Sequence, residues 1–376
     1  MLNMDLFSDL TITRHSLKAV KELAETFKKE TGRRPVLMEV CGSHTMAFAK
    51  TGIKASLKDH IELIAGPGCP VCVTDQKSID AMIQLSDGAN RILCTFGDMM
   101  RVPGSKRSLM KAKTEGKDIR VVYSPLDSVR IAKENPDKEV IFLGIGFETT
   151  IPILVLAIQE AERMQLNNYT VWMTTKLVEP VLRTLLDSGD IQLDGFLLPG
   201  HVSVVIGSQR YQFLAEEYGM PGVITGFEPV QLLSGVYKVL RLLLEKKVDI
   251  LNDYTYVVKE EGNLIAQGLL EKYLEPHDES WRGIGIIPNS GLVLKEEFEQ
   301  FDAKKKFQVS AGEPRKTKCR CGEIIRGLIK PEACVLFNKG CTPSQPIGPC
   351  MVSAEGTCAA HYQYMREGQG WNSELA

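Results

Sequence analysis

The stretch that decides the fold is residues 35–45, Pro35-Val-Leu-Met-Glu-Val-Cys-Gly-Ser-His-Thr45. Its first half is a short apolar run, which predicts a buried β-strand, and its second half is a glycine-bearing polar loop. Before it, His15–Thr31 has apolar residues at helical spacing, with Lys and Glu on the other face. After it, a second apolar run, Ile61–Ala65, leads into Gly66-Pro-Gly-Cys-Pro-Val-Cys72. Helix, strand and glycine loop therefore follow one another from the start of the chain.

The same alternation continues to about residue 245, and it is typical of parallel α/β sheets. Further strands are expected at Arg91–Phe96, Ile119–Tyr123, Val140–Leu143, Tyr169–Met173, Gly195–Leu198 and Gly222–Thr225. Helices are expected between them, notably at Lys77–Leu85, Ile151–Met164, Glu179–Leu186 and Pro229–Leu244.

Polar loops follow several of these strands. Because the carboxyl ends of parallel strands open onto the ligand crevice, we expect these loops to carry the chemistry. They are Cys41-Gly-Ser-His44, Gly66–Cys72, Gly97-Asp98, Gly146-Phe-Glu-Thr-Thr150, Pro199-Gly-His-Val-Ser203 and Thr225-Gly-Phe-Glu-Pro229.

The chain is long enough for two or three domains, and we divide it into three regions. Residues 1–140 are expected to form a first α/β lobe with the Cys41 and C-x-x-C loops, and residues 141–248 a second α/β lobe. In residues 249–376 helical periodicity weakens, and positions 311–358 are rich in Gly, Pro and Cys. A segment with so few residues for a hydrophobic core needs another source of stability, and a bound metal centre is the one we expect.

The amino-acid composition argues against several classes of function. The 376 residues include 44% hydrophobic and 24% charged residues, with a formal net charge of −2, which indicates a globular protein and argues against general nucleic-acid binding. No apolar run is long enough to span a membrane, and the first ten residues carry acids where a signal peptide needs positive charge. We therefore expect a cytoplasmic protein without a membrane or nucleic-acid partner.

Ten cysteines are unusual for such a chain, and in a reducing compartment they indicate metal binding or redox chemistry. Six of them fall between residues 319 and 358. Cys321, Cys334, Cys341 and Cys358 follow the spacing C-x12-C-x6-C-x16-C, which suits a 4Fe–4S cluster or a structural zinc. The wide spacing favours iron–sulfur, because zinc knuckles usually use two tight C-x2–4-C pairs. Buried free cysteines are the remaining alternative.

The other cysteines lie in the first hundred residues. Cys69-Pro-Val-Cys72 is a C-x-x-C motif at a helix start, which predicts a reversible dithiol/disulfide pair; half of a metal site is the alternative. Cys41, three residues before His44, is a candidate nucleophile or metal ligand, whereas Cys94 lies in an apolar run and is expected to be packed. The sequence has no G-x-S-x-G, P-loop or C-x3-C-x2-C motif, which argues against a hydrolase, a P-loop nucleotide site and the usual radical-SAM chemistry.

Together the loop motifs resemble the HypD family of [NiFe]-hydrogenase maturation proteins. The resemblance rests on the polar loops given above, Cys94-Thr-Phe-Gly-Asp98, and a tail with Cys321-Gly-Glu323, Cys334, Cys341-Thr-Pro343 and Met351-Val-Ser-Ala-Glu-Gly-Thr-Cys-Ala-Ala360. It covers nearly the whole chain in order.

The resemblance implies two α/β lobes facing a cleft, a C-terminal 4Fe–4S domain and a role in assembling the Fe(CN)2CO unit. It implies that Cys41 holds iron together with the N-terminal cysteine of a small HypC-type partner, and that Cys69 and Cys72 are the redox pair. It also implies a HypE-type cyanide carrier as partner and cluster ligands Cys321, Cys334, Cys341 and Cys358, with Cys319 and Cys350 outside the set.

Four polar residues are expected to line the cleft and to hydrogen-bond or protonate bound cyanide: His44, Glu148, Thr149 and His201. Local structural roles are the alternative, since Thr149 or Thr150 could cap the next helix and His201 could orient its own loop. For the whole chain, the competing functions are an iron–sulfur-dependent thiol–disulfide oxidoreductase without an iron-scaffold role and a zinc-stapled binding module.

Overall fold

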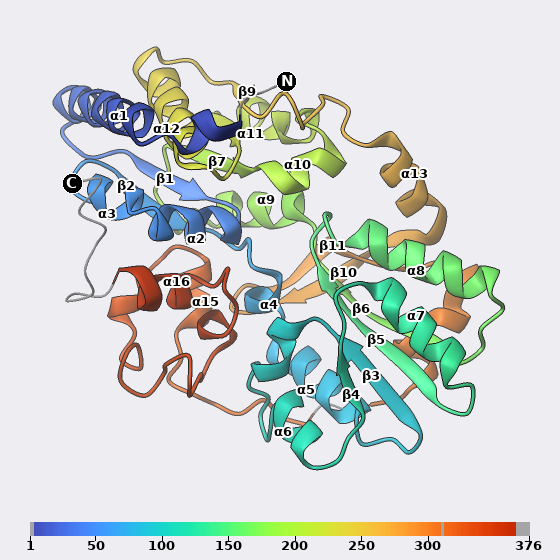
Figure 1. Cartoon of the computed structure of the whole chain (residues 1–376). Helices are drawn as coiled ribbons and strands as arrows, with labels where there is room; N and C mark the ends of the chain where they lie inside the picture. Colours follow the sequence, from blue (N-terminus) through green and yellow to red (C-terminus); the bar gives the residue numbers. More distant parts are fainter. Residues whose placement is uncertain (1–3, 310–311, 366–376) are drawn as a thin grey trace.

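The computed structural model describes residues 4–309 and 312–365, and it confirms an α/β fold with two parallel sheets (Figure 1). The first sheet has five strands in the order β2-β1-β7-β8-β9. Its strands are β1 (Val36–Glu39), β2 (Glu62–Ala65), β7 (Gly195–Pro199), β8 (Gly222–Thr225) and β9 (Ile250–Asn252). All neighbouring strands in it run parallel.

The second sheet has four strands in the order β4-β3-β5-β6 and is also parallel. Its strands are β3 (Arg91–Thr95), β4 (Ile119–Val121), β5 (Glu139–Gly146) and β6 (Tyr169–Thr175). Every strand expected from the sequence is present, with ends shifted by a few residues.

The sheets group the strands differently from the expected division of the chain at residue 140. β3 and β4 lie before that residue and β5 and β6 after it, yet these four strands pair in one sheet. The chain leaves the five-stranded sheet after β2, builds the four-stranded sheet, and returns as β7 to pair with β1. Hydrophobic patterning shows where strands begin but not which strands pair, so it could not reveal this excursion.

Helices cover the sheets where the apolar periodicity places them. α1 (Leu10–Thr31) begins at the N-cap Asp9, whose side chain accepts from the N–H of Ile12, and ends at Gly32 in the left-handed conformation. Its buried face packs with α12 (Pro229–Leu244) against one face of the five-stranded sheet. α7 (Pro125–Glu134) and α8 (Ile151–Arg163) cover the second sheet.

The remaining helices are shorter. The α-helices are α2 (Gly42–Lys50), α3 (Ile53–Leu57), α4 (Pro70–Val73), α5 (Gln76–Leu85), α6 (Leu109–Thr114), α9 (Val178–Ser188), α10 (Gly200–Ile206), α11 (Gln212–Glu216), α13 (Leu264–Tyr273), α14 (Ala303–Lys306), α15 (Cys321–Ile325) and α16 (Thr357–Tyr364). The 3-10 helices are η1 (Met4–Ser8), η2 (Gly97–Arg101), η3 (Gln209–Tyr211), η4 (Glu296–Phe301), η5 (Pro331–Ala333) and η6 (Pro349–Met351).

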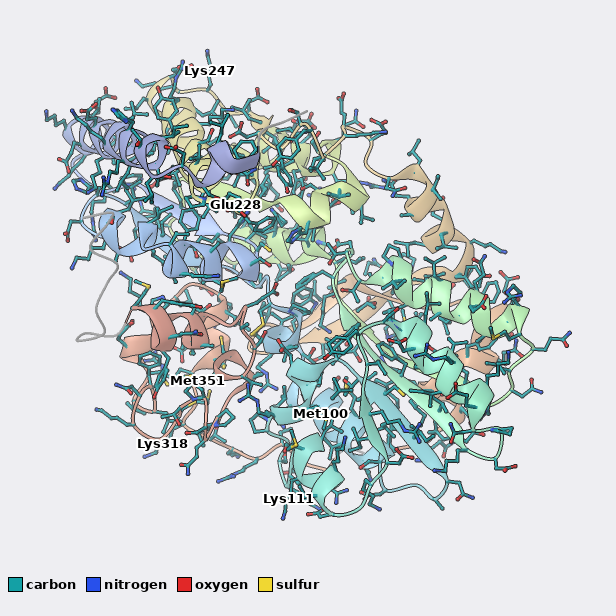
Figure 2. The ribbon with its side chains drawn as sticks, in the orientation of Figure 1. Met100, Lys111, Glu228, Lys247, Lys318 and Met351 are labelled. Atoms are coloured by element: carbon teal, nitrogen blue, oxygen red, sulfur yellow. A yellow bond between two sulfur atoms is a disulfide. The ribbon has the colours of Figure 1, made fainter. Side chains whose placement is uncertain are left out.

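Beyond the two sheets the chain forms a β-hairpin and then a cysteine-rich segment. The antiparallel hairpin of β10 (Leu274–Trp281) and β11 (Gly285–Leu294) was not expected from the sequence, because its strands do not keep a clean alternation. We call residues 319–365 the cysteine-rich segment. Figure 2 shows Met351 inside this part of the chain and Lys318 at its outer edge. Met351 belongs to a continuous core that also includes residues of both sheets.

In the part of the chain that the structure describes, no helix combines the length and the apolar character needed to cross a membrane.

Candidate metal and thiol site

Cys41 lies at the carboxyl end of β1, where the strand gives way to α2. As the N-cap residue of α2, it has the backbone N–H groups of Ser43 and His44 facing its sulfur, and these lower its pKa. Burial and the nearby carboxylate of Glu355 act in the opposite direction and outweigh them, so that burial chiefly raises the pKa of Cys41 to about 11. The free thiol is therefore protonated at neutral pH, although the residue remains partly exposed.

His44 is fully buried below Cys41 on the first turn of α2. Burial lowers its pKa to about 4, so the imidazole is neutral. Nε2 lies 3.3 Å from the carbonyl oxygen of Thr225 and 3.1 Å from that of Gly226. Because both partners are acceptors, Nε2 carries the proton, which leaves the buried Nδ1 as a lone pair without a partner among the described residues.

Phe227 connects the two histidines expected from the sequence. Its ring stacks on His44 with centroids 4.6 Å apart and on His201 with centroids 3.9 Å apart. His201 lies at the start of α10 with part of its side chain open to solvent, and the partial desolvation of its ring lowers its pKa. The loops after β1, β7 and β8 therefore meet at one aromatic side chain, which sequence reasoning placed in a motif but did not single out.

The C-x-x-C loop lies directly against the Cys41 loop. Cys69 and Cys72 form a disulfide at the start of α4, with Cα atoms 5.2 Å apart. Gly68 is essential to the contact, because a Cβ there would lie 1.9 Å from the carbonyl oxygen of Val40 and 2.6 Å from the Cα of Cys41. A Cβ on Gly42 would likewise lie 3.3 Å from the Cβ of Cys69. The disulfide and Cys41 are thus neighbours.

On its other side α4 packs against α15 and η6 of the cysteine-rich segment. There the structure brings cysteines from positions far apart in the sequence to one small apolar cavity. The cavity is lined by Cys319, Cys321, Cys334, Cys341 and Cys358, together with side chains such as Ile324, Leu336 and Phe337. Cys350 is not among the lining residues, but its thiol interacts with those of Cys321 and Cys358. Cys319, which the sequence left outside the set, therefore lines the same cavity as the four expected ligands.

The donors around this cavity are thiols in apolar surroundings. Within residues 4–309 and 312–365, no three His, Cys, Asp or Glu side chains are gathered closely enough to hold a metal ion. Instead the thiols are spread around a shared cavity, and Gly348 leaves room for them, since a Cβ there would lie 2.6 Å from the sulfur of Cys319 and 2.8 Å from that of Cys321. Sulfur ligands in an apolar shell are the environment of iron–sulfur clusters.

Glu148 and Thr149 are neighbours after β5, but Glu148 is buried and Thr149 is exposed. Glu148 is 5% exposed, and its Oε1 accepts from the N–H of Val178 at 2.8 Å. Its Oε2 is buried without a partner among the described residues, and burial raises its pKa to about 7. It lines a pocket of about 460 Å³ together with Glu179 and Arg210. Thr149 is exposed, and Thr150 occupies the N-cap position of α8 without a side-chain capping bond.

Glu355 completes the surroundings of Cys41, and sequence reasoning did not single it out. Its carboxylate accepts a hydrogen bond from the hydroxyl of Ser43, and burial raises its pKa. Two residues earlier, Ser353 donates to Asp98 at 2.9 Å. The cysteine-rich segment therefore contacts the loops of both sheets beside Cys41. The only sequence signal was the position of Glu355 within the stretch Met351–Ala360.

Two parallel sheets, a disulfide beside an isolated thiol, and a buried group of cysteines define a cysteine-rich α/β protein that is suited to metal binding through sulfur. Comparison with known proteins identifies the family. The HypD profile, described as "Hydrogenase formation hypA family", matches residues 15–365.

Named relatives agree with this match. The chain is 45% identical to "Hydrogenase maturation factor HypD" of Rhodobacter capsulatus over 365 residues, which cover 95% of this chain and 97% of that protein. It is 42% identical to the protein of the same name from Escherichia coli (strain K12) over 343 residues, covering 90% of this chain and 91% of that protein. The chain therefore belongs to the HypD family of hydrogenase maturation factors.

Proposed function

We propose that the protein is a scaffold and redox protein for assembling the Fe(CN)2CO unit of [NiFe]-hydrogenase, with the iron held by Cys41 together with a cysteine of a HypC-type partner. The observation that supports this proposal is the spatial order of the thiols: Cys41, then the Cys69–Cys72 disulfide, then the cysteine-rich segment. A HypE-type carrier would deliver the cyanide.

Cys41 suits an incoming iron ion for a physical reason. Low-spin iron with cyanide and carbonyl ligands favours soft sulfur donors, and the thiol must lose its proton to bind. The N–H groups of Ser43 and His44 stabilise negative charge on this sulfur, while burial and Glu355 keep the thiol protonated without iron. Iron then takes the place of the proton. Because Cys41 is partly exposed, a partner can reach it.

The surrounding polar groups offer opposite hydrogen-bonding roles. Neutral His44 presents the Nδ1 lone pair as an acceptor, whereas Glu148, with a pKa of about 7, carries a proton on about half of the molecules at neutral pH. Together with Thr149 and His201, they are our candidates for orienting or protonating the diatomic ligands.

The cysteines fit a 4Fe–4S cluster held by Cys321, Cys334, Cys341 and Cys358. A cluster bound there supplies single electrons. The chain's own contribution is to hold Cys69 and Cys72 in the helix that packs on this segment, so that their disulfide can be reduced to two thiols by two electrons and two protons.

The test is infrared spectroscopy of the chain purified with a HypC-type protein. We expect cyanide and carbonyl stretching bands that disappear in Cys41→Ala and persist in Cys94→Ala, the buried cysteine of β3. Absence of these bands in the intact complex would refute the scaffold and favour an iron–sulfur-dependent thiol–disulfide oxidoreductase. Maturation activity at the wild-type level in Cys69→Ala would refute the redox pair.

A further inference from the structure

The turn of the β10–β11 hairpin is inserted between the C-x-x-C helix and the cysteine-rich segment. Trp281 forms an isolated antiparallel bridge with Thr74, and the N–H of Arg282 donates to the carbonyl oxygen of Val73 at 2.8 Å. On the other side, a Cβ on Gly283 would lie 2.2 Å from the Cα of Gly322, which follows Cys321. The turn therefore contacts both thiol-bearing parts of the chain.

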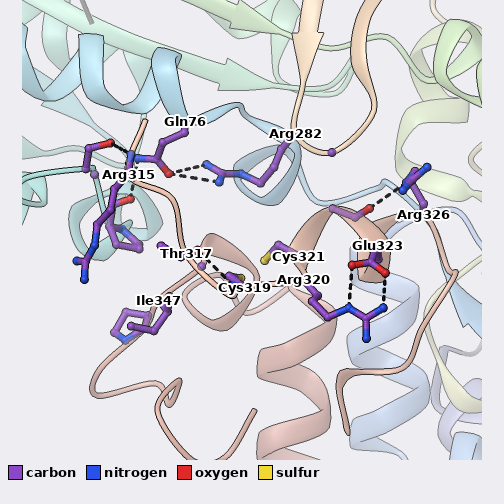
Figure 3. Close-up of a pocket in the computed structure, with 17 residues that line it drawn as sticks. Gln76, Arg282, Arg315, Thr317, Cys319, Arg320, Cys321, Glu323, Arg326 and Ile347 are labelled. Carbon is purple, nitrogen blue, oxygen red and sulfur yellow. Dashed lines mark hydrogen bonds and ion pairs between the residues drawn. The ribbon is translucent and has the colours of Figure 1, made fainter. Parts of the chain in front are cut away.

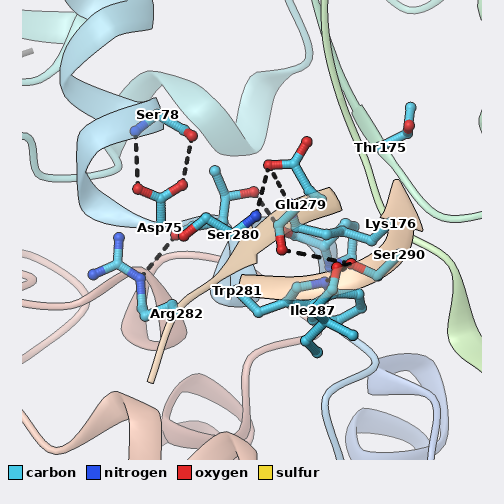
Figure 4. A network of polar contacts seen from close by, with 12 residues as sticks. Asp75, Ser78, Thr175, Lys176, Glu279, Ser280, Trp281, Arg282, Ile287 and Ser290 are labelled. Atoms are coloured by element: carbon cyan, nitrogen blue, oxygen red, sulfur yellow. Dashed lines mark hydrogen bonds and ion pairs between the residues drawn. The ribbon is translucent and has the colours of Figure 1, made fainter. Parts of the chain in front are cut away.

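The side chain of Arg282 strengthens the first of these contacts. Its Nε donates to the carbonyl oxygen of Thr74 at 2.9 Å, and its two Nη atoms lie 3.3 and 3.4 Å from Oε1 of Gln76. Figure 4 shows this side chain bonded to the chain just before Asp75. One guanidinium thus joins the end of α4, which carries Cys72, to the start of α5.

The same guanidinium faces the cysteines. It lines a pocket of about 370 Å³ with Cys319 and Cys321, and Figure 3 shows Arg282 and Gln76 across from these two sulfur atoms. Its guanidinium bonds to the carbonyl oxygen of Thr74 and to Gln76, which places its positive charge in the wall of the pocket that Cys319 and Cys321 also line.

We propose that Arg282 is a positioning residue that holds the Cys69–Cys72 helix against the cysteine-rich segment and whose charge favours the reduced, more negative form of a centre held at Cys321. This inference rests on the proposed function. Opening the disulfide breaks one S–S bond and consumes two electrons and two protons, and a one-electron centre at Cys321 is oxidised once for each electron it gives. A fixed cation beside that centre favours the state that holds the electron.

Two substitutions separate the two parts of the proposal. Arg282→Met removes both the charge and the hydrogen bonds. Arg282→Lys keeps the charge but loses the guanidinium group that bonds to both Thr74 and Gln76. Arg315→Met is the matched control, because Arg315 lines the same pocket from an exposed position and donates to the hydroxyl of Ser105 through its backbone N–H, which the substitution keeps. Arg282→Gln is a second neutral variant in case the methionine variant does not fold.

The first measurement needs no iron. Dithiothreitol reduces the disulfide and is itself oxidised to a cyclic disulfide, and the fraction of Cys69 and Cys72 that reacts with a maleimide gives the rate. Because both cysteines are buried, we expect loss of the Arg282 bonds to raise this rate about tenfold in both Arg282→Met and Arg282→Lys, and not in Arg315→Met.

The second measurement is the midpoint potential of the full chain with its cluster, followed by electron paramagnetic resonance. We expect Arg282→Met to disfavour the reduced state about tenfold, which is about 59 mV for one electron, and Arg282→Lys to stay near the wild type. Wild-type values of both quantities in Arg282→Met, or an equal change in Arg315→Met, would overturn the proposal. A chain that binds no cluster would instead overturn the cluster part of the proposed function, while the dithiothreitol rate still decides the positioning role.

Discussion

Replacing Glu148 by glutamine should make the stability of the protein less dependent on pH. Glu148 is 5% exposed, and burial raises its pKa from 4.5 to about 7. Between these values the folded state binds a proton that the unfolded state has released, so the free energy of unfolding falls as the pH rises. Below pH 4.5 both states are protonated, and this loss is absent.

The size of the effect follows from the shift. At 1.36 kcal/mol per pKa unit, the rise to about 7 corresponds to about 3 kcal/mol of stability lost between pH 4.5 and pH 8. Glu148→Gln cannot lose a proton, so its unfolding free energy should lack this decrease. An unpaired amide at the position of Oε2 has a cost of its own, about 1–3 kcal/mol, but that cost is the same at every pH.

The assay is urea unfolding of both proteins at pH 5 and pH 8. We expect the difference between the two pH values to be smaller in Glu148→Gln than in the wild type by about 2–3 kcal/mol. Glu134→Gln, on the exposed end of α7, is the control and should follow the wild type. Equal pH differences in Glu148→Gln and the wild type would show that Glu148 is not held protonated by its surroundings, and the proton-donor role proposed for it would fall with this result.

Three further predictions test the local geometry. Gly68→Ala should destabilise the protein by about 1–3 kcal/mol in thermal unfolding, because its Cβ would overlap the carbonyl oxygen of Val40. The control Gly268→Ala, whose Cβ would have nothing within 4 Å, should stabilise α13 by up to about 1 kcal/mol. Similar effects of the two substitutions would refute the close contact at Gly68. ¹⁵N chemical shifts should show His44 neutral and protonated on Nε2 at pH 6, with protonation only near pH 4, and a titration near pH 6.5 would contradict its burial. Lys54→Met should lower the free energy of unfolding in urea by about 3–5 kcal/mol, because it leaves the fully buried carboxylate of Glu39 unpaired. The double variant Lys54→Met with Glu39→Gln should recover much of this stability. No recovery would exclude the unpaired charge as the cause.

The sequence predicted the strands and the thiol loops because both depend on local patterns. Apolar runs of the right length gave β1 to β8, and glycine loops after them carried Cys41, Cys69 and Glu148. The pairing of the strands could not be predicted, because β7 pairs with β1 although the whole four-stranded sheet lies between them in the sequence. The hairpin was missed because β10 presents four consecutive exposed positions, which is not the pattern of a half-buried strand.

The sequence also did not reveal residues whose roles depend on contacts with distant parts of the chain. Phe227 matters because it stacks on His44 and His201, and Arg282 because it reaches Thr74 across 208 positions. Neither residue type at its position signals such a role. Burial also separates the two neighbours Glu148 and Thr149. Glu148 is enclosed and its Oε2 has no partner among the described residues, whereas Thr149 faces solvent.

The accessibility of the thiols gives a physical reason for dividing their roles. Cys41 is partly exposed, whereas Cys69 is 5% exposed and Cys72 and Cys321 are 0% and 4% exposed. Cys41 can therefore be reached from outside the chain, whereas the buried disulfide is shielded from dissolved thiols, which fits the internal electron supply proposed above. Glu355 and Ser353 extend this argument, because they contact Ser43 and Asp98 from the cysteine-rich segment. In the proposed function, a rearrangement of that segment on binding a cluster would move these two contacts beside Cys41, and this would couple loading of the segment to the proposed iron site.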